Sequence, residues 1–317
     1  MGLLNRKRVT GITEKSKNQN VKVRNIKPEK ARKVIRSFHT LRKNRSKLIN
    51  DLTQHFHGIN EENYMEIIRS DSHMKSVFEN QDKLSNIDAK SVLVGELGKV
   101  HRQMESQGGL ELYQLASTLG QQVSRGGDSS RKLIEWLKEL NLMSKGTYRA
   151  LEIGSLSSKN VISTCGLFQT VTRVDLHSQE PEEIIECDFM EFAVPKEEDR
   201  YDLVSCSLVL NFVPTPIQRG DMLRRIRLFF TESNPESPKL LFMVLPLPCI
   251  TNSRYLDNSL LLSMMSSLGF KQLKYHEATK VVYWLWEFDK NAKGPNIYRS
   301  KKEVRSGKNR NNFSILL

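Results

Sequence analysis

The hydrophobic pattern of the chain changes abruptly after Lys145-Gly146, and this change limits the folds open to it. From there on, short apolar runs alternate with turns or helical stretches, a pattern typical of parallel strands buried on both faces of a sheet. Such alternation indicates βαβ units and an α/β fold. Strands are predicted at 147–154, 171–176, 184–189, 201–210 and 239–246, with a helix at 216–232.

The last two predicted strands have a special orientation. A helix ended by Gly269 is followed by FKQLKYHEA and KVVYWLWEF, which are separated by little more than Thr279. Two parallel strands need a connection of about a dozen residues or more, so these two must form an antiparallel hairpin. One strand of the pair is therefore antiparallel to the rest of the sheet.

The first half of the chain, from Pro28 to about Leu142, has a helical pattern. In KARKVIRSFHTLRKNRSKLINDL, apolar residues recur mostly at three- and four-residue steps, so one face is apolar and the other is basic. Later stretches keep this period and predict an α-helical domain. The predicted organisation is a basic disordered tail at 1–28, an α-helical domain at 29–145, the sheet domain at 146–290 and a basic C-terminal tail at 291–317.

Positive charge is concentrated at the two ends of the chain. Residues 1–50 carry a net charge of +14 and residues 290–317 a net charge of +7, which leaves −8 for the body between them. Cationic, polar segments release counterions from a phosphate backbone when they bind it, so nucleic acid is the expected partner. A nuclear-localisation signal explains the N-terminal cations equally well, and both explanations point to the nucleus. No apolar run is long enough to span a membrane.

Neither a metal site nor a disulfide framework is indicated. The four cysteines include no C-x-x-C pair, and the seven histidines include no H-E-x-x-H motif. We expect reduced cysteines in the core and no metal.

Acidic residues follow three successive predicted strands. Glu152 and Gly154 lie at the carboxyl end of the first strand, where open α/β sheets bind ligands. Asp175 closes the second strand 21 residues after Gly154, at the spacing of a carboxylate that hydrogen-bonds a ribose. Asp188 ends the third strand, where it can accept from an adenine amino group while Phe189 packs on the ring. These residues predict a nucleoside-containing cofactor.

The loop after the first strand distinguishes between possible cofactors. It contains one glycine, and Ser155, Ser157 and Ser158 stand where a G-x-G-x-x-G motif would have glycines. A pyrophosphate needs a close, glycine-lined approach. S-adenosylmethionine carries a sulfonium and an amino acid instead, so one glycine with acidic neighbours suits it better. The alternative is a tight turn with Glu152 on the surface.

With its terminal hairpin, the segment 147–289 resembles a class I S-adenosylmethionine-dependent methyltransferase. More narrowly, YQLASTLGQ, RGGDSS, RALEIGSLS, VTRVDLHS, ECDFME and LVLNFVPTPIQRGDML resemble the fungal nucleolar family that methylates N1 of an adenine in large-subunit (25S) rRNA. The resemblance implies S-adenosylmethionine as cofactor, Gly154 and Asp175 as its contacts, and a nucleolar protein that binds rRNA or a pre-ribosomal particle through its basic tails.

Two other functions compete with this expectation. Metazoan relatives of the family are thought to be S-adenosylmethionine sensors of the TOR pathway, so binding without catalysis is the alternative. A nicotinamide-dependent dehydrogenase is disfavoured, because the chain lacks the glycine fingerprint and such an enzyme gains nothing obvious from basic tails.

The segment after the fourth predicted strand is the candidate substrate site. Asn211 can accept from the N6 amino group of adenine, and Phe212 can stack on a base taken out of its helix. Alternatively, Asn211 caps the turn before Pro214 and Phe212 packs in the core. Because adenine N1 already has a lone pair, positioning is expected to supply most of the rate.

The glycine-rich segment RGGDSS, Arg125–Ser130, also allows two interpretations. Asp128 or Ser129 can cap the following helix, with Gly126 and Gly127 supplying unusual backbone angles. Alternatively, the segment covers a bound cofactor or nucleotide.

Overall fold

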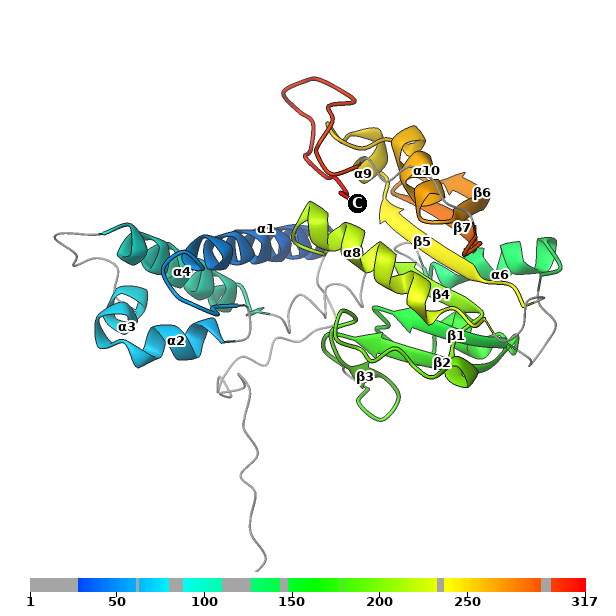
Figure 1. Ribbon diagram of the computed structural model, residues 1–317, viewed down its shortest axis with the longest axis horizontal. Coiled ribbons are helices and arrows are strands. Elements are labelled where there is room, and N and C mark those ends of the chain that lie inside the picture. Colours follow the sequence, from blue (N-terminus) through cyan, green and yellow to red (C-terminus); the bar gives the residue numbers. More distant parts are fainter. Residues whose placement is uncertain are drawn as a thin grey trace, which may run out of the picture.

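A seven-stranded sheet forms the centre of the C-terminal domain (Figure 1). In this computed structural model, the described residues are 28–60, 63–79, 88–109, 127–142, 148–178, 180–232, 237–291 and 298–317. The strands are β1 Tyr148–Ile153, β2 Phe168–Asp175, β3 Ile185–Glu186, β4 Leu203–Ser207, β5 Leu240–Pro246, β6 Phe270–Glu277 and β7 Val281–Phe288.

The strand order is β3-β2-β1-β4-β5-β7-β6. Strands β1 to β5 are parallel to one another, and β7 is antiparallel to both β5 and β6. The predicted fold class, an α/β sheet with a terminal antiparallel hairpin, is therefore confirmed. The chain order reverses between β1 and β4, and open sheets of this kind bind ligands at the carboxyl ends of the strands beside such a reversal.

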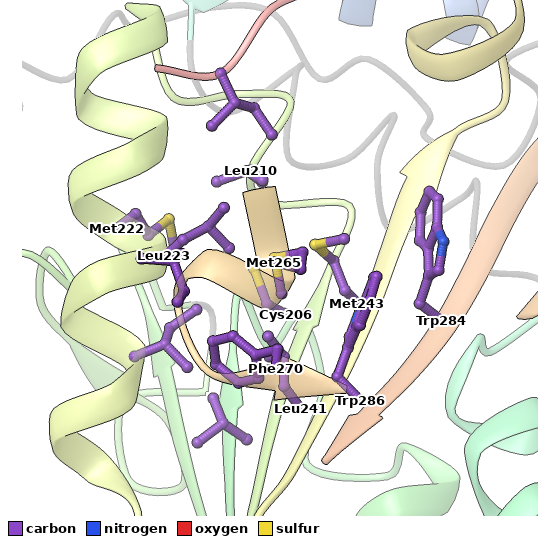
Figure 2. Packing of buried hydrophobic residues seen from close by; sticks show 14 of the residues in the cluster. Cys206, Leu210, Met222, Leu223, Leu241, Met243, Met265, Phe270, Trp284 and Trp286 are labelled. Atoms are coloured by element: carbon purple, nitrogen blue, oxygen red, sulfur yellow. The ribbon is translucent and has the colours of Figure 1, made fainter. Parts of the chain in front are cut away.

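Helices cover both faces of the sheet, and successive residues of each strand point to opposite faces. Along β5, Met243 packs with α8 (Pro216–Ile226) and α10 (Asn258–Ser267), and its neighbour Phe242 packs with α6 (Ser130–Glu139). Figure 2 shows the first of these clusters, which includes Met222 and Leu223 of α8 and Trp286 of β7. The helices are α6 Ser130–Glu139, α7 Val161–Thr164, α8 Pro216–Ile226, α9 Pro248–Thr251 and α10 Asn258–Ser267.

Helices precede the sheet, as the sequence predicts, but one of those expected in the helical domain packs on the sheet. The other described helices that precede the sheet are α1 Pro28–Leu52, α2 Tyr64–Ser70, α3 Ser72–Glu79 and α4 Ala89–Ser106, and α1 packs along α4 through apolar residues. The sequence places α6 in this domain, yet Trp136 of α6 packs edge-on against Phe242 of β5 at 6.3 Å. The expected boundary at residue 145 is corrected accordingly, because a helical period does not reveal which core a helix joins.

Several predicted elements are shorter than expected, among them the strand predicted at 184–189, which is β3 Ile185–Glu186. The apolar run 201–210 continues beyond β4, but the strand ends at Ser207 because Leu208 has a φ of +57°. A positive φ at a bulky residue is unusual and turns the chain out of the sheet. The predicted helix 216–232 ends as α8 at Ile226 and continues as a 3₁₀ turn over Arg227–Phe229.

The two chain ends differ from each other. The predicted basic tail 1–28 lies outside the described residues except for Pro28, where α1 begins. The sequence also predicts a basic tail at 291–317, but Phe313, Ile315 and Leu317 are buried, with exposures of 7%, 1% and 4%. The prediction of a tail is wrong for this packed end of the chain. It rests on the charge of the segment, whereas the apolar residues of NFSILL pack the segment onto the sheet domain. No described helix is long and apolar enough to cross a membrane.

Candidate functional site

The turn after β1 joins three strands at their carboxyl ends. Gly154 has a φ of +76°, and its N–H donates to the Val174 carbonyl of β2 at 2.7 Å. A Cβ at Gly154 would lie 2.3 Å from Cγ2 of Val209, in the loop after β4. Both the backbone angle and this close approach require glycine. The structure thus brings the Gly154 turn against the loop that carries Asn211.

Glu152 holds the loop that follows this turn. Its carboxylate accepts from Ser155 Oγ and from Asn160 Nδ2, both at 2.8 Å, and the residue is only 8% exposed. Burial raises the pKa of Glu152 to about 7, against these two hydrogen bonds, which lower it. Glu152 is therefore not the surface acid of the alternative interpretation.

Two further carboxylates occupy backbone donors of the same loop. Glu180 accepts from the N–H of Ser158 at 2.9 Å. Asp128 accepts from the N–H of Val161, the first residue of α7. Neither carboxylate is among the predicted site residues, because only the folded loop brings them to it.

These contacts decide which kind of cofactor the loop can hold. A dinucleotide places its pyrophosphate on free N–H groups of the glycine loop and of the helix start. Here Glu180 and Asp128 already occupy such donors, and together with Glu152 they make the loop acidic. The residues present therefore fit a ligand with a positively charged group, such as the sulfonium and ammonium of S-adenosylmethionine, better than a pyrophosphate.

The described part of RGGDSS, Gly127–Ser130, connects α6 to this loop. Asp128 accepts from the N–H of Ser130 at 2.9 Å, which caps α6, whereas Ser129 makes no capping hydrogen bond. Ser130 Oγ accepts from the N–H of Ile162 at 3.0 Å, and Ser129 Oγ lies 2.7 Å from Ser207 Oγ at the end of β4. The segment therefore caps a helix, as expected of Asp128, and also fastens α6 to the edge of the site.

Asp175 ends β2 beside the same turn. Its Oδ1 accepts from the N–H of His177 at 2.9 Å, and no other hydrogen bond to its carboxylate occurs among the described residues. Burial raises the pKa of Asp175 to about 6; Glu186 raises it further, whereas Arg42 of α1 lowers it. The carboxylate has acceptor capacity left for a ligand hydroxyl.

Asp188 and Phe189, after β3, lie in different surroundings. Asp188 is exposed, and its Oδ1 accepts from the N–H of Met190 at 2.8 Å. Phe189 is 5% exposed and packs on Phe229 with ring centroids 5.0 Å apart. The expectation that Phe189 packs on adenine is not supported, since its ring is part of the core beneath the site.

Asn211 carries an unsatisfied acceptor in the loop after β4. Its Oδ1 is buried and has no hydrogen-bond partner in the described structure. The expected alternative, capping of the turn before Pro214, would have used this atom. Phe212 is only partly buried, and its N–H donates to the Val209 carbonyl at 2.8 Å, which closes a tight turn.

The remaining candidate ligands are dispersed over the described residues. No group of three His, Cys, Asp or Glu side chains there is arranged to hold a metal ion. The cysteines are free thiols: Cys206 is buried, and Cys165, Cys187 and Cys249 are partly buried.

Comparison with known proteins gives a family and close relatives. Residues 98–315 match the family described as Bmt2, 25S rRNA (adenine(2142)-N(1))-methyltransferase. The 25S rRNA (adenine(2142)-N(1))-methyltransferase of Saccharomyces cerevisiae is 36% identical over 337 residues, covering 96% of this chain and 98% of that protein. The 25S rRNA adenine-N(1) methyltransferase of Schizosaccharomyces pombe is 41% identical over 236 residues, covering 73% of this chain and 85% of that protein. The resemblance found in the sequence is confirmed.

Solved structures resemble about half of this chain, and more distantly. The N-methyltransferase NodS of Bradyrhizobium japonicum, in complex with S-adenosyl-l-homocysteine, has a TM-score of 0.39 at 10% identity, covering 53% of this chain and 92% of that chain. An S-adenosylmethionine-dependent methyltransferase from Clostridium acetobutylicum has a TM-score of 0.42 at 10% identity, and the match covers 54% of this chain and 97% of that chain.

Proposed function

The chain belongs to the family of 25S rRNA (adenine(2142)-N(1))-methyltransferases, and we propose that it transfers a methyl group from S-adenosylmethionine to N1 of an adenine in large-subunit rRNA. The observation that carries the substrate assignment is the buried, unpaired Oδ1 of Asn211 at the carboxyl end of β4. Burying an acceptor without a partner costs roughly 1–3 kcal/mol, so a ligand that donates to it is expected.

The cofactor site is assigned to the edge formed by β1, β2 and β3. Bound S-adenosylmethionine would supply a methyl group on a positively charged sulfonium. Asp175 accepts from the ribose hydroxyls, and the Gly154 turn provides the close backbone approach. Glu152 acts by holding the loop, through its hydrogen bonds to Ser155 and Asn160. The exposed carboxylate of Asp188 remains a candidate for the adenine amino group.

The substrate adenine is assigned to the loop after β4. Asn211 Oδ1 accepts from the N6 amino group, which donates two hydrogens and lies next to N1 on the same edge of the base. This contact orients N1, whose lone pair needs no general base. Phe212 stacks on the extruded base and offsets part of the cost of removing it from its helix.

Contact with RNA beyond the target base is assigned to the basic ends. Residues 1–27 supply an N-terminal polycation. Near the C-terminus, Lys301, Lys302 and Lys308 are exposed, and none forms an ion pair with an acidic residue of the described structure. Lysines without an acidic partner can neutralise phosphates and release counterions. An rRNA or pre-ribosomal substrate implies a place in ribosome biogenesis, and hence a nuclear, nucleolar location.

The test is methyl transfer by the purified chain to an rRNA fragment, with N1-methyladenosine mapped on the product. Wild type is expected to methylate one adenine, and Asn211→Ala to lower the single-turnover rate by ~100-fold, because misplacing a reactant by about 1 Å costs about that much. Cofactor affinity should stay unchanged. Asn291→Ala, at an exposed amide after β7, is the control and should keep the wild-type rate.

The competing function predicts a different outcome. A sensor would bind S-adenosylmethionine tightly and transfer no methyl group to rRNA or to pre-ribosomal particles. That result, obtained with a folded chain that binds the cofactor, would refute the proposed activity.

A further inference from the structure

A buried arginine lies behind the proposed substrate loop. Arg219 of α8 is 2% exposed, and its guanidinium donates to three backbone carbonyls: Val213 at 3.0 Å, Pro214 at 3.1 Å and Ser314 at 2.7 Å. It forms no ion pair with a carboxylate in the described structure. Burial lowers the pKa of Arg219 to about 10, so the group is still charged at neutral pH.

The C-terminal end of the chain holds this arginine from the other side. The Phe313 ring lies beneath the guanidinium, with its centroid 4.5 Å from the guanidinium carbon. The N–H of Leu316 donates to the Pro216 carbonyl at 2.9 Å. A Cβ at Gly220 would lie 1.7 Å from the Leu316 carbonyl oxygen, so this α8 glycine is required for the close approach. The last residues are thus packed directly on α8, beside its amino end (Figure 1).

Two of the carbonyls that Arg219 binds belong to the proposed substrate loop. Val213 and Pro214 directly follow Asn211 and Phe212, and on the other side Leu210 is fully buried in the core. Asn211 and Phe212 are therefore flanked by two fixed points. One is the packing of Leu210 in the core, and the other is the pair of hydrogen bonds from Arg219 to Val213 and Pro214.

We propose that Arg219, held in place by residues 313–317, is a positioning residue that fixes the Asn211–Phe212 loop for methyl transfer. The proposal rests on the proposed function, since it assumes that this loop receives the adenine. A guanidinium suits the role because its planar fork satisfies several carbonyls in fixed directions. A lysine in the same place offers a point charge without that fork, and the loop would lose its defined position.

The test compares two arginines that each donate to three backbone carbonyls, Arg219 through three guanidinium nitrogens and Arg305 through one. Arg305 donates to the carbonyls of Ile250, Ser253 and Leu256 at 2.8, 3.2 and 3.1 Å, and none of its hydrogen bonds within the described residues reaches the substrate loop. Arg219→Lys is expected to lower the single-turnover methylation rate by ~10-fold to ~100-fold, with cofactor affinity unchanged. Arg305→Lys should lower the unfolding midpoint and keep the rate. Equal rates for the two variants would overturn the proposal.

A double-mutant cycle separates positioning from general destabilisation. If Arg219 acts through Asn211, the rate loss in Asn211→Ala/Arg219→Lys will be clearly smaller than the product of the single losses. Independent, multiplicative losses would overturn the proposal. Hydrogen exchange over residues 208–215 should rise in Arg219→Lys and not in Arg305→Lys, and unchanged exchange there would also overturn it.

A milder variant covers the case in which Arg219→Lys fails to fold. Phe313→Leu keeps an apolar side chain but removes the ring beneath the guanidinium, and it should lower the rate by about 3-fold to 10-fold. A wild-type rate in folded Phe313→Leu would count against the C-terminal support. Failure of the proposed function is distinct from all of these results, because wild type itself would then transfer no methyl group.

Discussion

The buried carboxylate of Glu152 should make the stability of the sheet domain depend on pH. Its pKa is raised from an ordinary 4.5 to about 7 in the folded chain, chiefly by burial. An acid with a raised folded pKa binds more protons when folded than when unfolded, so stability falls as pH rises from about 4.5 to about 7. At about 1.4 kcal/mol for each pKa unit, this group costs roughly 3 kcal/mol above pH 7.

Glu152→Gln removes the titration and keeps the shape of the side chain. The amide oxygen can accept from Asn160 while Ser155 rotates its hydroxyl to accept from the amide nitrogen. The free energy of unfolding of Glu152→Gln minus that of wild type should therefore rise by roughly 3 kcal/mol between pH 4.5 and pH 7.5 and then level off. In Ser155→Ala, a hydrogen bond that lowers this pKa is removed, so the wild-type decline should become larger.

Urea unfolding followed by tryptophan fluorescence measures this difference in the relevant domain. All three tryptophans, Trp136, Trp284 and Trp286, are buried in the sheet domain, so the signal does not report on the helical domain. The other titrating groups contribute equally to wild type and to Glu152→Gln and cancel in the difference. A difference that stays constant from pH 4.5 to pH 7.5 would refute the assignment of Glu152 as a buried, loop-holding acid.

Further expectations concern the cofactor, the turn and the basic ends. Asp175→Ala should weaken the binding of both S-adenosylmethionine and S-adenosylhomocysteine by ~1–3 kcal/mol in calorimetry, because both ligands carry the ribose. Equal affinities in wild type and variant would show that Asp175 does not contact the ligand. Gly154→Ala should destabilise the fold by ~1–3 kcal/mol through its φ of +76° and its clash with Val209, and an unchanged unfolding midpoint would contradict the close approach. Deleting residues 1–27 should leave cofactor affinity unchanged. It should also reduce the slope of log K for RNA binding against log salt concentration by roughly 0.7–0.9 for each phosphate that the tail neutralises. An identical slope would show that the tail is only a localisation signal. Changing Lys301, Lys302 and Lys308 together to Ala should flatten the slope similarly without lowering the unfolding midpoint, and an unaltered slope would remove this surface from the RNA site.

The sheet, and the edge at which the candidate cofactor residues lie, were predictable because they depend on local patterns. Buried parallel strands are continuous apolar runs, and the short link at Thr279 forces a hairpin wherever the strands lie. Gly154 and Asp175 could be placed side by side because they end neighbouring strands, and the carboxyl ends of parallel strands meet at one edge. Such inferences need only the sequence neighbours of each residue.

The surroundings of individual side chains were decided by the tertiary structure. Phe189 follows a strand, where an adenine-binding residue is expected, but it packs on Phe229, forty positions later, and its ring lies in the core. The cationic end of the chain carries the apolar residues Phe313, Ile315 and Leu317, whose burial depends on α8. Charge and period describe a segment by itself, whereas burial depends on partners that are distant in sequence. For that reason the sequence was enough to predict the sheet and the edge proposed for the cofactor, whereas the contacts of Arg219 with both the end of the chain and the loop of Asn211 depend on the folded structure.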